Sequence, residues 1–203
     1  PVFPTPTIGM LGIVEDKSHI TSLSFNSEKD LIFLIGTSKN NISCSEYLTS
    51  FHKIKESSTP EFCLDTEFKI QEAVKNLIRK NLIKSAHDVS DGGLFICLIE
   101  SCIDKNFGFH INGEKSIRDD AFLFGESPSR IIVSVSKSKE NNFVKYLESE
   151  KVDFRLIGSV TSGEISYNDV SFGDIKDYKS LYENSLSDLS LIHISEPTRQ
   201  EAI

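Results

Sequence analysis

The stretch Ser85–Leu94, SAHDVSDGGL, restricts the fold of this chain more than any other part of its sequence. It follows residues 67–83, where apolar side chains such as Ile70 and Val74 recur at helical spacing, and it leads into an apolar segment at residues 94–103. The sequence therefore predicts a helix, a short strand, a turn and another helix in succession. Strand-to-helix turns of this kind are where α/β folds place their ligands.

The polar groups of this turn are of the types that bind phosphate or a divalent cation. In a strand that ends near Ser90, Asp88 and Ser90 would share one face, while Asp91 would cap the following helix. The amides of Gly92 and Gly93 would then be open to a phosphate. The carboxylates would instead favour a hydrated magnesium ion.

A simpler interpretation of the turn needs no ligand. Asp91 would only cap the helix, the two glycines would only allow tight packing, and His87 would be a core residue with satisfied hydrogen bonds. The spacing of these residues is compatible with both interpretations.

A second polar stretch, Phe122–Val135 or FLFGESPSRIIVSV, places charged and hydroxyl groups at the entrance of an apolar strand. Glu126, Ser127, Ser129 and Arg130 come together there within five residues. A loop with serine and arginine can bind a phosphate or a carboxylate through charge-assisted hydrogen bonds. The alternative is an ordinary loop in which Arg130 pairs with Glu126.

The remaining pattern predicts a mixed α/β domain. Apolar runs predict strands at residues 8–14, 31–36, 106–111, 130–135 and 154–160. Other patterns predict a charged loop at 115–120, a helix at 138–149 and a terminal hairpin at 164–172 around Asn168 and Asp169. Ser43 and Glu46 have the spacing of a capping box, which predicts a short helix at 43–51. Because strand, helix and strand follow one another over residues 130–160, the fold class is α+β or layered α/β with a local βαβ unit.

Charge and cysteine content narrow the function classes. The net charge of -8 argues against a general nucleic-acid or anionic-membrane surface, since both need clustered Lys and Arg. No apolar run reaches the length of a membrane span. The four cysteines form no metal-type cluster, and Cys97 and Cys102 lie in an apolar segment, which predicts buried thiols in a reducing, cytoplasmic compartment.

Five motifs occur in one order along the chain: PTPTIGMLGIVED, LIFLIG, SEYL, SAHDVSDGGL and LFGESPSRIIVSV. Together they resemble the C-terminal part of the phosphoribosylformylglycinamidine synthase family, ATP-dependent ligases of purine biosynthesis. The resemblance covers residues 1 to about 186. It implies tandem modules, each an N-type domain followed by a C-type α+β domain.

The resemblance also implies how the chain is divided. Residues 1–24 would be the last strand of the second N-type domain, and residues 25–186 would be an AIR-synthase-related C-terminal domain, with a layered sheet and ferredoxin-like βαβ elements. Residues 187–203 contain LSLIHISEPTR, which resembles a translated sequencing adapter, so we expect a non-native tail that packs on nothing. The chain starts in mid-pattern, and we expect a fragment that is inactive alone.

The chemistry implied by the resemblance belongs to the intact enzyme. The ATP γ-phosphate would activate the amide oxygen of formylglycinamide ribonucleotide as an iminophosphate, which glutamine-derived ammonia would displace, with Mg²⁺ neutralising the phosphates. The family's catalytic histidine and most magnesium ligands lie upstream, so we assign no catalytic residue and no metal ligand. The residues expected to line a nucleotide or substrate cleft are Asp88, Ser90, Asp91, Gly92, Gly93, Glu126, Ser127, Ser129 and Arg130.

Two positions depart from the family pattern. Pro128 stands where glutamine is usual, and Ser43–Cys44 stand where many relatives have a glycine pair, so we expect no phosphate site before SEYL. The implied partners are the preceding modules of the same polypeptide, a glutaminase subunit and a small accessory subunit.

Two other functions remain open at this stage. One is another ATP-dependent member of the same superfamily, such as aminoimidazole ribonucleotide synthetase or a selenophosphate- or thiamine-phosphate-handling kinase. The other is a scaffold without a ligand, in which Asp88 and Arg130 would make only internal pairs.

Overall fold

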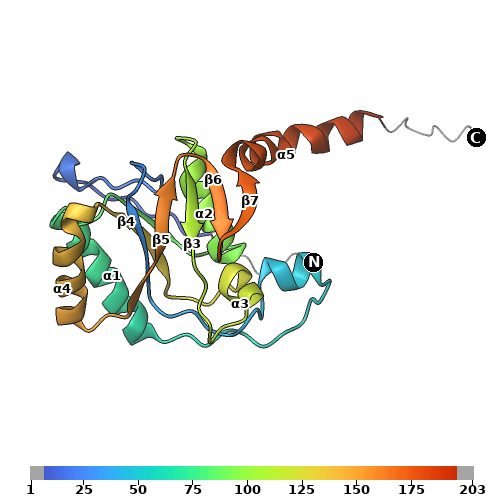
Figure 1. The fold of residues 1–203 in the computed structure, drawn as a ribbon. Coiled ribbons are helices and arrows are strands. Elements are labelled where there is room, and N and C mark those ends of the chain that lie inside the picture. Colours follow the sequence, from blue (N-terminus) through green and yellow to red (C-terminus); the bar gives the residue numbers. More distant parts are fainter. Residues whose placement is uncertain (1–6, 196–203) are drawn as a thin grey trace, which may run out of the picture.

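The computed structural model describes the main chain of residues 7–195 and the side chains of residues 7–185. These residues form one seven-stranded sheet with helices on both faces (Figure 1). The strands are β1 (Leu31–Ile35), β2 (Ser85–Asp88), β3 (Gly108–Ile111), β4 (Ile131–Val135), β5 (Phe154–Thr161), β6 (Glu164–Tyr167) and β7 (Val170–Asp174). The helices are α1 (Leu64–Arg79), α2 (Gly93–Ile103), α3 (Asp119–Phe124), α4 (Glu140–Glu150) and α5 (Ile175–Ser195), with short helical turns η1 (Lys17–His19), η2 (Tyr47–Phe51) and η3 (Lys137–Lys139).

The first strand in the sequence lies inside the sheet, with neighbours on both sides. The strand order is β2-β4-β1-β5-β3-β6-β7, and β1 is antiparallel to both β4 and β5. β4 and β5 are therefore parallel, and α4 connects them across β1. This confirms the predicted βαβ unit over residues 130–160, in the split form in which another strand lies between the two parallel ones.

The alternation of side chains along β1 divides the core into two parts. Phe33 and Ile35 point to the face covered by α1 and α4, whereas Ile32 and Leu34 point to the face covered by α2, α3 and the start of α5 (Figure 1). A strand buried on both faces has no polar alternation, which explains the continuous apolar run LIFLI.

Several predicted elements are confirmed with small changes at their ends. The predicted helix at 67–83 is α1, the apolar segment at 94–103 is α2, and the helix at 138–149 is α4. The predicted hairpin is formed by β6 and β7. Its turn residues Asn168 and Asp169 have φ angles of 48° and 63°, as a tight two-residue hairpin loop requires.

The strand predicted at residues 8–14 has no partner strand in the described chain, and its pairing with a sheet of a preceding domain stays a prediction. Its apolar side chains are exposed, with 83% of Ile8 and 106% of Leu11 accessible, and none of these residues pairs with a strand of the described chain. A strand needs a partner for its backbone groups, and the pattern alone cannot supply one. The first contact with the sheet comes later, where the Ala86 amide donates to the Ser22 carbonyl at 3.1 Å.

The predicted capping box at Ser43 and Glu46 is wrong. Ser45 makes the local bonds instead: its hydroxyl donates to the Ile42 carbonyl at 2.6 Å and accepts from the Leu48 amide at 3.1 Å. The Ser43 amide already donates to the Asn41 side chain at 2.7 Å, so a turn occupies this position and the helical segment is only Tyr47–Phe51.

Two helices were not predicted. α3 begins within the predicted charged loop at 115–120, because Asp119 and Asp120 lie in its first turn and favour the positive end of a helix. α5 follows the hairpin, with Ile175 fully buried and the Lys179 ammonium donating to the Ile103 carbonyl at 3.2 Å. Within the predicted tail at 187–203, the main chain is helical as far as Ser195. The side chains of the tail and all of residues 196–203 lie outside the described residues. The prediction that the tail packs on nothing therefore stays a prediction.

We expect Leu98→Ala to lower the free energy of unfolding by about 3 kcal/mol, because Leu98 is fully buried in the core under α2 and the substitution leaves a cavity. Ile96→Ala on the same helix is the matched control, since 38% of Ile96 is exposed, and should cost about 1 kcal/mol or less. Urea unfolding of the full chain, followed by circular dichroism, measures both. Equal losses in the two variants would contradict this packing.

Candidate functional site

The two predicted polar stretches meet at one end of the sheet. β1 and β2 end there, and β4 and β5 begin there: Ile131 is paired with both Asp88 and Ile35, and Ile35 is also paired with Phe154. The Val89 amide donates to the Arg130 carbonyl at 2.9 Å, which brings the turn after β2 directly against the loop before β4.

The turn after β2 presents its acidic side chains to solvent. Asp88, Ser90 and Asp91 are exposed, and the Ser90 hydroxyl donates to the Asp88 carboxylate. The prediction that Asp91 caps the next helix is wrong, because the capping position is Gly92, with φ of 82°. Glu126 takes the capping role instead: its Oε1 accepts from the Gly92 amide at 2.8 Å.

The glycine amides are not open, which corrects the prediction of a phosphate site formed by them. The Gly92 amide donates to Glu126, and the Gly93 amide donates to the Ser90 carbonyl at 3.0 Å. Gly93 instead permits close packing of helices, since a Cβ there would lie 2.8 Å from the Leu123 carbonyl oxygen of α3.

Arg130 is buried, with 2% of its surface exposed. Its guanidinium group donates hydrogen bonds back to the loop that precedes β4. Its Nε donates to the Ser127 carbonyl at 2.9 Å, its Nη2 to the Gly125 carbonyl at 2.5 Å and its Nη1 to the Ser38 hydroxyl at 3.4 Å. Burial lowers the pKa of Arg130 to about 10, so the guanidinium is still charged at neutral pH. Within the described residues Arg130 makes no ion pair with Glu126 or any other carboxylate.

The same loop also connects both helical layers. Glu126 Oε1 accepts a second amide, that of Glu46 at 2.8 Å. The Ser129 hydroxyl donates to the Glu67 carboxylate of α1 at 2.5 Å. The Ser129 carbonyl approaches β1 so closely that a Cβ on Gly36, which has φ of +90°, would lie 2.1 Å from it. Sequence reasoning missed Gly36, Ser38 and Glu67, because nothing local marks a residue whose partner is distant in the chain.

The nine predicted site residues thus divide by exposure. Asp88, Ser90 and Asp91 face solvent, whereas Gly93, Ser127 and Arg130 are buried, and Gly92, Glu126 and Ser129 are intermediate. In the part of the chain described by the structure, no three His, Cys, Asp or Glu side chains are grouped to hold a metal ion. Ligand binding by the predicted residues stays a prediction.

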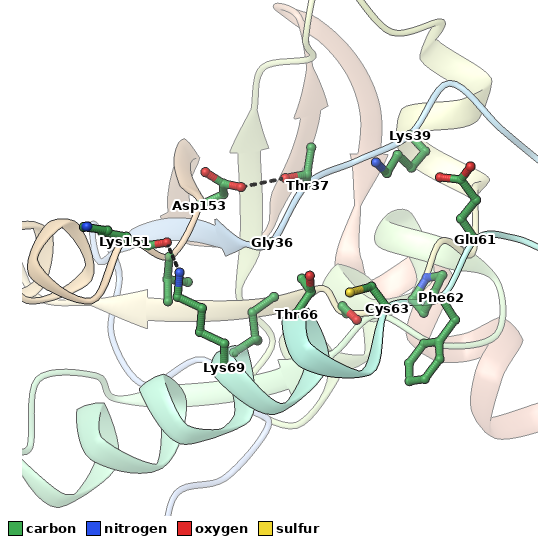
Figure 2. A pocket seen from close by; sticks show the side chains of 14 residues that line it. Gly36, Thr37, Lys39, Glu61, Phe62, Cys63, Thr66, Lys69, Lys151 and Asp153 are labelled. Carbon is green, nitrogen blue, oxygen red and sulfur yellow. Dashed lines mark hydrogen bonds between the residues drawn. The ribbon is translucent and has the colours of Figure 1, made fainter.

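A pocket of about 540 Å³ opens at this end of the sheet, on the side of α1 and α4 (Figure 2). We call it the α1 pocket; its lining residues are Gly36, Thr37, Lys39, Glu61, Phe62, Cys63, Thr66, Lys69, Ile70, Pro128, Ser129, Lys151, Val152 and Asp153. Of the predicted site residues only Ser129 belongs to it. Four separate chain segments build the pocket, so no single motif could have revealed it.

Cys63 lies in the α1 pocket at the start of α1. The neighbouring Thr66 hydroxyl and amide hold the pKa of its exposed thiol below the ordinary value. Burial has the opposite effect on Cys97 and Cys102, and raises the pKa of both thiols far above the ordinary value. The predicted burial of Cys97 and Cys102 is confirmed.

The chain is similar to known proteins both in sequence and in fold. The family described as AIR synthase related protein, C-terminal domain, matches residues 28–169. The phosphoribosylformylglycinamidine synthase subunit PurL of Thermoanaerobacter pseudethanolicus is 38% identical over 165 residues, which is 81% of this chain and 22% of that protein. PurL of Prochlorococcus marinus is 40% identical over 157 residues, which is 76% of this chain and 20% of that protein. The chain spans about a fifth of the length of these curated relatives.

Solved structures show the same fold at low identity. T. maritima PurL complexed with FGAR has a TM-score of 0.68 and 15% identity, covering 79% of this chain and 29% of that one. The HypE-HypF complex has a TM-score of 0.53 and 16% identity, covering 75% of this chain and 54% of that one. These matches confirm the mixed α/β class and the resemblance drawn from the ordered motifs.

We expect Glu126→Ala to lower the free energy of unfolding by about 2 kcal/mol, because two backbone amides lose a charged acceptor. Hydrogen exchange of the Gly92 and Glu46 amides should accelerate most. Glu126→Gln is the matched control, because it keeps an oxygen at the same position and should preserve most of the protection. Unchanged exchange at both amides in Glu126→Ala would contradict the bridging role.

We expect iodoacetamide at neutral pH to alkylate Cys63 and to spare Cys97 and Cys102 until the chain is unfolded in urea, as mass spectrometry can follow. Thr66→Val should slow the reaction of Cys63, because loss of the Thr66 hydroxyl raises the pKa of the thiol and lowers the thiolate fraction. Thr49→Val, at an exposed position outside the pocket, is the control. An unchanged rate in Thr66→Val would show that Thr66 does not stabilise the thiolate.

Proposed function

The chain belongs to the AIR synthase related family, whose C-terminal domain it carries at residues 28–169, and we propose that it serves as the C-terminal part of a phosphoribosylformylglycinamidine synthase. One observation carries the proposal: 81% of the chain aligns with the PurL subunit of that synthase at 38% identity. The whole enzyme would be an ATP-dependent carbon–nitrogen ligase. It would convert formylglycinamide ribonucleotide and ammonia to the amidine through an iminophosphate.

The exposed segment at residues 8–14 supports the proposed division of the chain. Four of its apolar side chains, those of Ile8, Met10, Leu11 and Ile13, are at least 83% exposed. Surface of this kind is usually covered in the working protein. In this proposal residues 1–24 complete a sheet of the preceding N-type domain, and residues 25–186 form the C-type domain.

Within the enzyme, the residues at the sheet end would have two different tasks. The oxygens of Asp88, Ser90 and Asp91 are exposed and are of the kind that Mg²⁺ prefers, and a site with few protein ligands suits an ion that keeps its waters. The amides of Gly92 and Gly93 do not fit a phosphate, because both already donate within the chain. The nucleotide phosphates would therefore be bound by parts of the enzyme outside this chain. Bound Mg²⁺ would supply charge neutralisation for phosphoryl transfer.

Glu126, Ser127, Ser129 and Arg130 would hold this wall in place rather than touch the substrate. Arg130 and Ser127 are buried, and the Glu126 carboxylate is used by two amides. Their contribution to activity would come through the position of Asp88 and Asp91. This keeps all the predicted residues in the site but separates exposed ligands from supporting groups.

The proposed partners follow from the same assignment. They are the preceding modules of the polypeptide, a glutaminase that supplies ammonia and a small accessory subunit, in a cytoplasmic enzyme. A structure of PurLQS from Thermotoga maritima shares the fold with a TM-score of 0.59. No helix in the described residues is both long and apolar enough to cross a membrane.

A scaffold role is the second candidate, and the contacts of Arg130 favour it. Its hydrogen bonds all end within the domain, as does the contact between Ser90 and Asp88. A domain of this kind would align the two modules without binding a ligand. The two candidates differ in whether the exposed carboxylates affect turnover.

The proposal is tested by exchanging domains in a relative. Residues 25–186 replace the matching segment of Thermoanaerobacter pseudethanolicus PurL, and formation of the amidine is measured with ammonia and ATP. We expect activity within about tenfold of the parent, because the cleft walls are shared. A folded chimera without activity would contradict the synthase assignment.

Variants of the active chimera separate the two candidate roles. Asp88→Ala with Asp91→Ala should lower kcat/KM by about a hundredfold if both carboxylates act through a bound cation. Asp104→Ala, an exposed residue at the other end of α2, is the control. Unchanged kinetics in the double variant would favour the scaffold.

A further inference from the structure

The solvent-facing side of α1 exposes apolar side chains at its start. Leu64 and Phe68, one turn apart on the helix, are 70% and 64% exposed, and Phe62, just before the helix, is 59% exposed. α1 lies next to α4 and far from α5 (Figure 1), and Figure 2 shows Phe62 pointing away from the α1 pocket. Large apolar side chains gathered on one exposed helix face are typical of an interaction surface.

The helical repeat places charged side chains on the same side of α1 as Leu64 and Phe68. Lys75 lies two turns after Phe68, and Arg79 follows one turn later. The buried side chains of the helix lie on the opposite side, where they pack in the core: Ile70, Ala73, Val74 and Leu77. We call the solvent-facing side the outer stripe of α1; its residues are Leu64, Asp65, Phe68, Gln71, Glu72, Lys75 and Arg79.

The outer stripe changes in charge along its length. Asp65 lies in the first turn of α1, whereas Lys75 and Arg79 lie towards its end. Among the described residues Asp65 and Arg79 have no ion-pair partner, and Lys75 pairs only with Glu72 of the same helix. Two copies of such a stripe complement each other when they run antiparallel, because the acidic start of each helix then faces the basic end of the other.

One antiparallel register brings the charges and the apolar groups together. With the two-fold axis at the level of residue 70, Asp65 of each copy faces Lys75 of the other. Phe68 then lies on the aliphatic stems of Glu72 and Lys75 of the other copy, and the two Phe68 rings flank the axis. Arg79 of each copy lies at the level of Phe62 of the other, where a guanidinium can pack on an aromatic ring. Helices packed about 8–10 Å apart allow all of these contacts.

We propose that the outer stripe of α1 is the interface of a two-fold symmetric dimer of this chain, with the two helices antiparallel and Phe68 near the axis. The apolar contacts supply most of the affinity and the charges fix the register, because exposed ion pairs contribute little by themselves. The interface is independent of the ligase assignment, since none of the nine residues predicted for the cleft lies on it.

The test is sedimentation equilibrium of the full chain. A single pair of helices buries little surface, so we expect a dissociation constant on the order of 100 μM. Phe68→Gln should weaken the dimer at least about tenfold, because it removes the central aromatic ring. The matched control is Leu11→Gln, which removes another exposed apolar side chain from the segment at 8–14 and should dimerise as the wild type does.

Charge reversal tests the antiparallel register. Asp65→Lys and Lys75→Glu should each weaken self-association, because each places like charges opposite one another twice in the dimer. A mixture of these two variants should associate more tightly than either variant alone, because both contacts are again between opposite charges. Lys145→Glu, at an exposed position on α4, is the control and should associate as the wild type does.

Three results would overturn the proposal. The first is a folded wild type that stays monomeric well above the expected dissociation constant, which would leave the stripe to a different partner. The second is association that Leu11→Gln abolishes and Phe68→Gln does not, which would place the contact in the segment at 8–14. The third is a mixture of the two charge variants that associates no better than each variant alone. Unchanged unfolding temperatures would show that the weakened dimers are still folded.

Discussion

The buried guanidinium of Arg130 is the interaction on which this end of the molecule depends. A charge that is taken out of water costs several kcal/mol unless polar groups replace the water. Here the carbonyls of Gly125 and Ser127 and the hydroxyl of Ser38 replace it, so the loop before β4 must close into one shape. That shape then fixes where Glu126 and Ser129 point, and through them where α2 and α1 begin. One interior charge thus sets the geometry of both helical layers around the sheet end.

Elements with strong periodicity could be predicted from the sequence, whereas their ends often could not. The run LIFLI, the spacing of apolar residues in α1 and the Asn168–Asp169 turn are each determined by residues within the element itself. The start of α2 depends on a distant residue, because the amide of Gly92 donates to Glu126, 34 residues further along the chain. A local rule assigns that task to the adjacent Asp91. The segment at 8–14 shows a related limit: a strand needs a partner, no local pattern contains one, and the described chain supplies none.

The candidate site shows the same limit. Motif order identified the family and selected two stretches that do meet in space. Residue type could not show that Arg130 is internal while Asp91 is exposed, since both are charged residues next to turns. The α1 pocket could not be predicted from the sequence. Lysines such as Lys39 and Lys69 are common on protein surfaces, and only the fold shows that they line the same cavity.

The position of β1 inside the sheet has a consequence for how the domain is made. A ribosome produces this strand first, yet Leu31 pairs with Val135 on one side and Ser159 on the other. Until both neighbours have been synthesised, an apolar strand with two free edges is present in the nascent chain, and such edges promote aggregation. Pairing over so many residues is also slow, because loop closure precedes the stabilising contacts. The yield of folded domain should therefore be governed by how quickly the unit β4–α4–β5 closes around β1.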